Sequence, residues 1–238
     1  MNALGFTVTR TQSRPGGHRC GVIHIRAENQ ELLTRLFVRL QEFYESPVGS
    51  IRGHHFTLPE LERVYVPRHE KDRGTGKFTY YTDWHGYNVP GTVIDNFFAM
   101  FSDLTDGEKW LREVTRGYDS YYLIGSHDGG DPNEDALDHE LVHATYYLDD
   151  GYRAAVHRQI DLFHDDATDT FHKLVGLLTD WGYCDDMLID EINAYLATTD
   201  LEWWAVKTGD LPLAIALSRE AKPFRSLAAA YRTKERWL

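Results

Sequence analysis

Two histidines four residues apart, with a glutamate next to the first, are the residues in this chain best suited to chemistry. They lie in the segment Asp138-His139-Glu140-Leu141-Val142-His143. In a helix, residues i and i+4 lie on one face, so His139 and His143 can bind one metal ion from the same side. Glu140 would then lie beside a water molecule on that metal. The spacing predicts a zinc site with a general base next to it.

The residues around this motif predict a helix from about residue 131 to residue 149. Asp131 can cap its start, Pro132 suits the first helical position, and Glu134 follows three residues after the cap. The segment Asp149-Asp150-Gly151 then ends the helix. The motif is therefore expected inside a helix that has its own start and stop signals.

The two faces of this helix differ in character. His139 and His143 fall nearly opposite an apolar stripe. We expect the stripe to be the buried face and the histidine face to be free to bind a metal. The stripe consists of Leu137, Leu141, Ala144 and Leu148.

A catalytic zinc site needs a third protein ligand. The metzincin pattern is excluded, because Tyr146 and Asp149 stand where it requires Gly and His. A glutamate on a later helix is the usual alternative, and Glu191 fits, 48 positions after His143 on a helix predicted from Met187 to Thr199. His157 ranks second, because it lies near the start of the next helix. Other residues that can serve are His127, Asp149, Asp150, His164, Asp165, Asp186 and Asp190.

The combination of His139-Glu140-x-x-His143 with Glu191-Ile192-Asn193-Ala194 resembles the gluzincin metallopeptidases, which pair H-E-x-x-H with E-x-x-A on a second helix. The CAAX-processing membrane proteases and the anthrax-lethal-factor-like toxins look similar in this respect. The resemblance covers two helices, about thirty residues. It implies a zincin-like fold in which His139, His143 and Glu191 hold Zn²⁺ and Glu140 activates water to hydrolyse a protein or peptide.

The chain departs from the CAAX-processing proteases at Tyr195, where they have an aspartate that orients a histidine ligand. The partner that orients the ligands is therefore unassigned. Tyr195 lies one turn after Glu191, so its hydroxyl can stabilise the tetrahedral intermediate. The alternative is a tyrosine with a structural role only.

The remaining patterns predict an α+β fold, with a small mixed sheet in the N-terminal half packed on a mainly helical C-terminal half that carries the metal helices. We expect one metallopeptidase-like domain over residues 1–238, with a mixed lobe at 1–126 and a helical lobe at 127–238. Strands are expected at 20–26, 63–66, 77–82 and 121–125. Further helices are expected at 28–45, 93–101, 106–116, 153–181 with a break at 164–166, and 211–238 with an interruption at Pro223. The segment Tyr121 to Ser126 is either an edge strand that binds an extended substrate or an ordinary core strand.

The composition of the chain argues against several classes of function. The net charge of −12 and the pI near 5.4 argue against nucleic-acid binding. There is no apolar segment typical of a signal peptide or of a membrane-spanning helix, so we expect a cytoplasmic protein or one exported without a classical signal. Cys20 and Cys184 have neither metal-site nor redox spacing. The sequence does not predict the oligomeric state or the substrate specificity.

Two other functions use the same residues. Two histidines and one carboxylate are also the ligands of non-haem iron(II) oxygenases, although such a site does not need Glu140. A zincin-like protein without catalysis is the other alternative, with the aromatic segment Phe78 to Tyr87 or Trp203-Trp204 as a surface for a partner. The retained glutamate favours hydrolysis.

Overall fold

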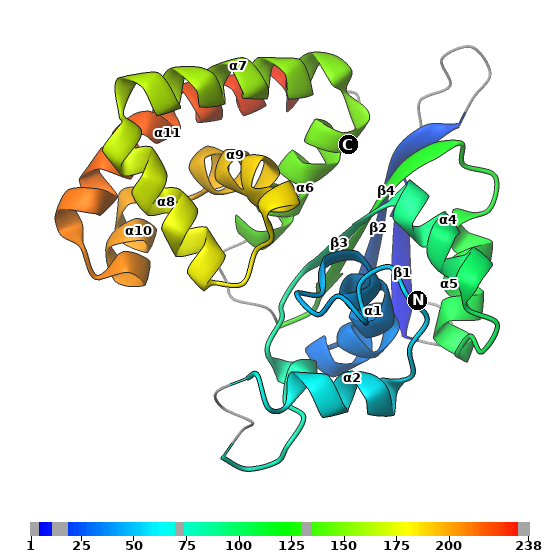
Figure 1. Ribbon diagram of the computed structural model, residues 1–238. Coiled ribbons are helices and arrows are strands. Elements are labelled where there is room, and N and C mark those ends of the chain that lie inside the picture. Colours follow the sequence, from blue (N-terminus) through cyan, green and yellow to red (C-terminus); the bar gives the residue numbers. More distant parts are fainter. Residues whose placement is uncertain (1–4, 11–18, 70–73, 130–134, 233–238) are drawn as a thin grey trace. The chain divides into compact units, whose positions relative to one another are not determined.

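The protein has an α+β structure that divides into two compact units, Met1–Asn133 and Glu134–Leu238 (Figure 1). The structure is a computed structural model that describes residues 5–10, 19–69, 74–129 and 135–232. In these ranges every strand lies in the first unit, and the second unit is helical. This confirms the predicted α+β class with a small mixed sheet in the N-terminal half.

The sheet of the first unit has four strands in the order β1-β2-β4-β3. They are β1 (Phe6–Arg10), β2 (Cys20–Ala27), β4 (Ser120–His127) and β3 (Tyr87–Pro90). β2 and β4 are parallel, whereas β1 and β3 pair with them antiparallel. Leu123 of β4 lies opposite Ile23 of β2 and Val89 of β3. Because β4 is paired on both sides, it is an interior strand, and the interpretation of Tyr121 to Ser126 as a substrate-binding edge strand is wrong.

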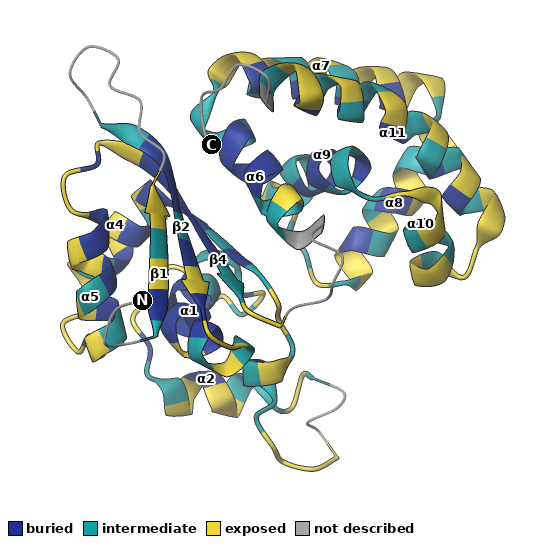
Figure 2. Cartoon of the chain, turned by 180° about the vertical axis from the view of Figure 1, so that it is seen from behind, coloured by how far each residue is buried: buried dark blue, intermediate teal, exposed yellow. Residues whose placement is uncertain are grey.

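Helices of the first unit form its core with one face of this sheet (Figure 2). They are α1 (Gln30–Glu45), α2 (Leu58–Tyr65), α4 (Gly91–Met100) and α5 (Asp106–Thr115), with the short 3₁₀ helix η2 (Tyr80–Thr82). Phe37 of α1 lies so close to Gly125 of β4 that a Cβ there would be 2.8 Å from its ring. The glycine therefore allows α1 to lie directly on the strand.

Two segments predicted as strands, 63–66 and 77–82, are not strands. The first belongs to α2, which begins with a capping box formed by Thr57 and Glu60 and buries Leu61. The second contains η2, where Tyr80 is fully buried beside the rings of Tyr65 and Phe78. Short runs of alternating apolar and polar residues therefore predicted strands wrongly in these two segments. A helix cap determines the structure of the first segment, and an aromatic cluster determines that of the second.

The second unit consists of helices around a central one. They are α6 (Asp135–Leu148), α7 (Asp150–Asp166), α8 (Thr168–Asp180), η3 (Asp185–Met187), α9 (Leu188–Thr198), α10 (Leu201–Thr208) and α11 (Leu211–Arg232). The central helix is α9, which packs against α6, α8 and α11 and buries Ile192, Ala194 and Leu196. The predicted break near 164–166 is confirmed, because Ala167 separates α7 from α8.

Helix α11 runs through Pro223, so the predicted interruption is wrong. A proline removes one helical hydrogen bond, but Ala221 and Phe224 beside it are fully buried and hold the helix in place. Helix α10 was not predicted. It begins at Asp200, whose side chain accepts a hydrogen bond from the Trp203 backbone N–H.

Three further observations bear on the expectations. The cap residues Asp131 and Glu134 lie outside the described residues, as does the expected first turn of the metal helix. No helix in the described part of the chain is long and apolar enough to cross a membrane. Cys20 and Cys184 do not form a disulfide.

Candidate metal centre

Helices α6 and α9 bring three metal-ligating side chains together. His139, His143 and Glu191 each offer one ligand atom, and these atoms all lie within 4.8 Å of one another. The Nε2 atoms of His139 and His143 are 3.1 Å apart. Glu191 Oε1 lies 3.6 Å from His143 Nε2, and Glu191 Oε2 lies 3.7 Å from His139 Nε2. Two ligands of one tetrahedral ion are separated by about 3.3 Å, so this cluster can hold a metal ion.

Both imidazoles are oriented through their other ring nitrogen. His139 Nδ1 lies 3.3 Å from Thr198 Oγ1, and His143 Nδ1 forms an ion-pair contact of 2.9 Å with Asp190 Oδ2 that lies outside hydrogen-bond geometry. The Thr198 hydroxyl donates to the Ala194 carbonyl oxygen at 2.8 Å, so its oxygen is left to accept from His139. In neutral rings an oxygen beside Nδ1 favours the tautomer with the proton on Nδ1 and the lone pair on Nε2. The lone pairs of both histidines are thereby aimed at the same point, as metal ligands require.

Asp190 takes the orienting role that the sequence left unassigned. It directly precedes Glu191, so adjacent residues of α9 supply the ligand and the carboxylate that holds another ligand. Both acids lie in the first turn of α9. The positive end of the helix dipole favours negative charge there and offsets part of the cost of burying two carboxylates.

The histidine face of α6 is not open, contrary to the expectation. The His143 side chain is only 2% exposed, and Val142 beside it belongs to the core of the second unit. Glu191 is 6% exposed and His139 is 16% exposed. Leu141 and Ala144 of the predicted apolar stripe are buried as expected, but the histidine face is covered as well, because α9 packs against the side of α6 that carries the ligands. Water would therefore reach the cluster past His139 more readily than past His143.

The charges in the cluster act on each other. Burial lowers the pKa of His143, but Asp190 and Glu191 outweigh it and hold the pKa well above its usual value. Burial raises the pKa of Glu191, yet His143 and His139 bring it below its ordinary value. A metal ion requires neutral imidazoles and would displace the proton of His143, and the carboxylates then leave the cluster negatively charged. Buried negative charge of this kind favours a bound cation.

An unsatisfied atom supports a cation at this place. Glu191 Oε2 is buried and has no hydrogen-bond partner among the described residues. An unpaired buried carboxylate oxygen is costly unless it binds a proton donor or a metal. Together with the donor set of two nitrogens and one oxygen, this atom shows that the residues fit a metal ion.

Glu140 and Tyr195 both lie near the cluster. Glu140 is partly buried, and its negative charge raises the pKa of His143 alongside Asp190 and Glu191. The ring of Tyr195 lies edge-on to that of His139, with centroids 4.7 Å apart. Glu140, the predicted general base, and Tyr195, which carries the predicted hydroxyl, therefore both lie near the ligands.

The alternative third ligands have other contacts. His157, ranked second, lies 2.9 Å from the Tyr146 hydroxyl through Nε2. Asp149 caps α7, Asp150 pairs with Arg153, and His164 contacts Asp165. His127 belongs to the first unit and contacts His85. The cluster of His139, His143 and Glu191 is the one group of three such ligands found in the described ranges.

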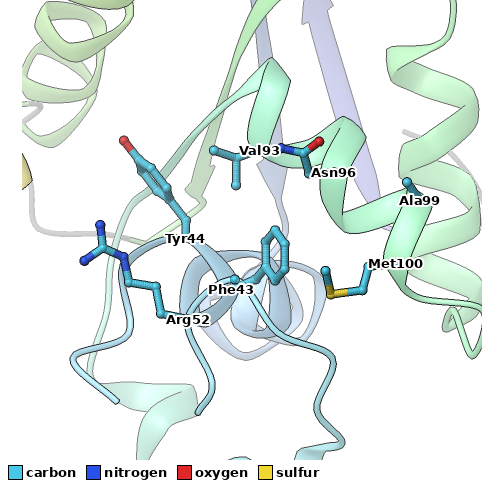
Figure 3. Close-up of a pocket in the computed structure, with 8 residues that line it drawn as sticks. Phe43, Tyr44, Arg52, Val93, Asn96, Ala99 and Met100 are labelled. Carbon is cyan, nitrogen blue, oxygen red and sulfur yellow. The ribbon is translucent and has the colours of Figure 1, made fainter. Parts of the chain in front are cut away.

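The first unit has a pocket of a different kind. It has a volume of about 540 Å³ and lies between α1, the turn after it and α4 (Figure 3). Its lining residues include no histidine, cysteine or acid. They are Phe43, Tyr44, Arg52, Gly53, Val93, Asn96, Ala99 and Met100. The pocket therefore lacks both metal ligands and a carboxyl group for acid–base catalysis.

Comparison of the chain with protein-family models, curated proteins and solved structures finds no match. The resemblance to the gluzincins therefore rests on the ligand residues of α6 and α9. Function has to be argued from the chemistry of these residues.

Proposed function

We propose that this protein is a zinc-dependent metallopeptidase in which His139, His143 and Glu191 hold the metal and Glu140 is the general base. The observation that carries the proposal is the convergence of the three ligand atoms within 4.8 Å, with Glu140 next to His139. Two imidazoles and one carboxylate are a ligand set of catalytic zinc sites, which leave a fourth position for water. The substrate class is a protein or peptide.

The side chains around the metal have separate tasks in this mechanism. Zinc, when bound, lowers the pKa of a coordinated water and polarises the scissile carbonyl. Glu140 accepts a proton from the attacking water as its oxygen bonds to the carbonyl carbon. Glu140 then delivers that proton to the amide nitrogen as the C–N bond breaks, which yields one carboxyl and one amine product. Asp190 and Thr198 keep the imidazoles in the required orientation.

The test combines metal analysis with peptide cleavage. We expect zinc to co-purify with the wild type at one ion per chain and to be lost from Glu191→Ala. Glu140→Gln should keep the zinc and lose about 10²- to 10⁴-fold in kcat on an unfolded protein substrate, the usual contribution of a general base. Glu202→Gln changes an exposed acid of the same unit and is the matched control.

Each contrary result has a definite meaning. Unchanged cleavage by Glu140→Gln rejects the general-base role. Iron in place of zinc points to the two-histidine, one-carboxylate oxygenases. Zinc that stabilises a protein unable to cleave any of a broad peptide library points to a zincin-like binding protein.

A further inference from the structure

A second pair of histidines, His85 and His127, meets in the first unit. His127 is the last residue of β4, and His85 comes two residues before β3. These strands are antiparallel with Tyr87 opposite Gly125, so His85 comes opposite His127 two positions further along. The Nδ1 atom of His85 and the Nε2 atom of His127 are 3.3 Å apart. Two ring nitrogens from separate segments of the chain therefore face each other.

The orientation of His127 is fixed by the backbone after it. Its Nδ1 atom lies 3.1 Å from the carbonyl oxygen of Asp128, which can only accept, so Nδ1 carries the hydrogen. In the neutral ring the lone pair is then on Nε2, the atom that faces His85. The Asp128 backbone N–H donates to the Ala27 carbonyl oxygen at 2.9 Å, which ties this turn to β2. The fold thus holds the lone pair of His127 in place.

His85 is anchored through its neighbour but remains open to water. The Trp84 carbonyl oxygen accepts a hydrogen bond of 2.9 Å from Gln30 of α1. His85 itself is exposed. Its hydrogen can therefore move to Nε2 through water and leave a lone pair on Nδ1. The distance of 3.3 Å between the two rings is longer than a typical N–H hydrogen bond of about 2.9–3.0 Å. It matches the separation of about 3.3 Å between two nitrogens bound to one tetrahedral ion.

The donor set favours one kind of metal. The carboxylate of Asp128, next to His127 in the chain, pairs with Arg26. Two imidazole nitrogens are then the protein ligands, and water fills the other positions of an ion. Because a site open to water imposes little geometry, the general order of affinities applies, in which Cu²⁺ binds more tightly than Zn²⁺. Two exposed ligands also hold zinc less tightly than three buried ones, so we expect zinc to fill the metal centre first.

We propose that His85 and His127 form a second metal site, an exposed chelate of two imidazoles that binds Cu²⁺. Both ligands belong to the first unit, so this site is separate from the proposed peptidase centre in the second unit. The protein occupies two positions of the ion, and the others remain open to water or to a ligand from solution.

The test is a titration of the isotope-labelled full-length chain with Cu²⁺ to two equivalents, with glycine as a competing chelator. The paramagnetic ion broadens the nuclear magnetic resonance signals of nearby amides. We expect broadening at His85, Gly86, His127 and Asp128. His85→Gln and His127→Gln should each weaken copper binding there by about 100-fold, because two ligands held together bind as a chelate. His54→Gln is the matched control, since His54 is an exposed histidine of the same unit.

The outcomes are distinct. Broadening around His85 and His127 that is lost in both single variants and kept in His54→Gln supports the site. A wild type without broadening there, or broadening that survives either single substitution, overturns it. Unchanged signals elsewhere in the spectrum show that each variant is folded. The signals of the second unit are read in the same spectra, so failure of this site leaves the proposed metallopeptidase centre untouched.

Discussion

Both units of this protein bury charged side chains, but the two units differ in how fully these charges are paired. In the first unit, Arg39 of α1 binds Glu108 of α5 through two hydrogen bonds of 2.8 and 2.5 Å and reaches Asp103 at 3.1 Å. Arg39 and Glu108 are 5% and 2% exposed. In the second unit, the similarly buried carboxylate of Glu191 faces two imidazole nitrogens at more than 3.5 Å.

The two clusters differ in the polar atoms that remain without a partner. The planar guanidinium matches a carboxylate with two parallel bonds, so the Arg39 cluster needs nothing further. The cluster of α6 and α9 retains an unpaired carboxylate oxygen and aims two imidazole nitrogens at one point. Burial of charge is common to both clusters. The convergence of incompletely paired ligand atoms on one point is what indicates a binding site.

The sharpest test of this comparison is Arg39→Ala. We expect the free energy of unfolding to fall by about 3–5 kcal/mol, because Glu108 is left charged and buried. Zinc affinity should not change, because Arg39 belongs to the first unit and the ligands belong to the second. The control is Arg35→Ala, which removes an exposed pair with Glu31 on the same helix and should cost at most about 0.5 kcal/mol. Urea denaturation measures both, and equal losses would contradict the comparison.

Zinc itself should stabilise only the incomplete cluster. At a hundredfold excess over its Kd, a ligand that binds the folded state alone adds about 2.7 kcal/mol. We expect hydrogen exchange to slow in α6 and α9 on adding zinc and to remain unchanged in β2 and β4. A chelator should reverse the effect, and Glu191→Ala should show none. Uniform protection of both units would instead indicate nonspecific binding.

Asp190→Asn should weaken zinc binding without removing a ligand. The amide oxygen keeps a polar atom beside His143 Nδ1, but the negative charge of the ion pair is lost. We expect a 10- to 100-fold loss of affinity, about 1.4–2.7 kcal/mol. Asp185→Asn is the control, because it is an exposed acid on η3. Isothermal titration measures both, and equal affinities would show that Asp190 does not orient the ligand.

The smallest expected effect concerns Glu42, a carboxyl of the first unit whose partners are neutral. Burial raises the pKa of Glu42 above its ordinary value, although the neighbouring hydroxyls of Ser46 and Tyr80 oppose this. The folded state thus keeps its proton at a pH where the unfolded chain has released it. Stability should fall as the pH rises from the ordinary carboxyl pKa through the raised one.

Glu42→Gln removes this titration. We expect the stability of the wild type relative to Glu42→Gln to decrease with rising pH across that window, by an amount on the order of 1 kcal/mol. Thermal unfolding at several pH values measures the difference. A difference that grows with pH in favour of the wild type would mean that Glu42 is stabilised as a charge, as Glu108 is.

The sequence was sufficient for elements whose signals are local and strong. The apolar spacing of α1 and α9 and the β-branched residues of β2 predicted those elements to within two residues. It failed for β3, whose four residues form a strand only because β4 pairs with them. It also failed at Pro223, where burial in the core outweighs the lost hydrogen bond. Long-range packing decided both cases.

The candidate site shows the same division. His139, Glu140, His143 and Glu191 were identified because motif spacing on a helix is a local property. Tyr183 was missed, because its loop reaches the Tyr195 hydroxyl only through tertiary packing. Asp190 was considered as a ligand, but its role beside His143 depends on how closely α9 packs against α6. The groups that orient the ligands could be identified only from the structure.

The place of the ligands along the chain has a consequence for the order of biosynthesis. Glu191 leaves the ribosome 48 positions after His143, which at 5–20 residues per second is a delay of about 2–10 s. The first unit precedes both helices, so it can finish folding before a complete ligand set exists. A metal ion that needs all three ligands would then bind only once most of the protein has been made, and the proposed hydrolysis would begin no earlier.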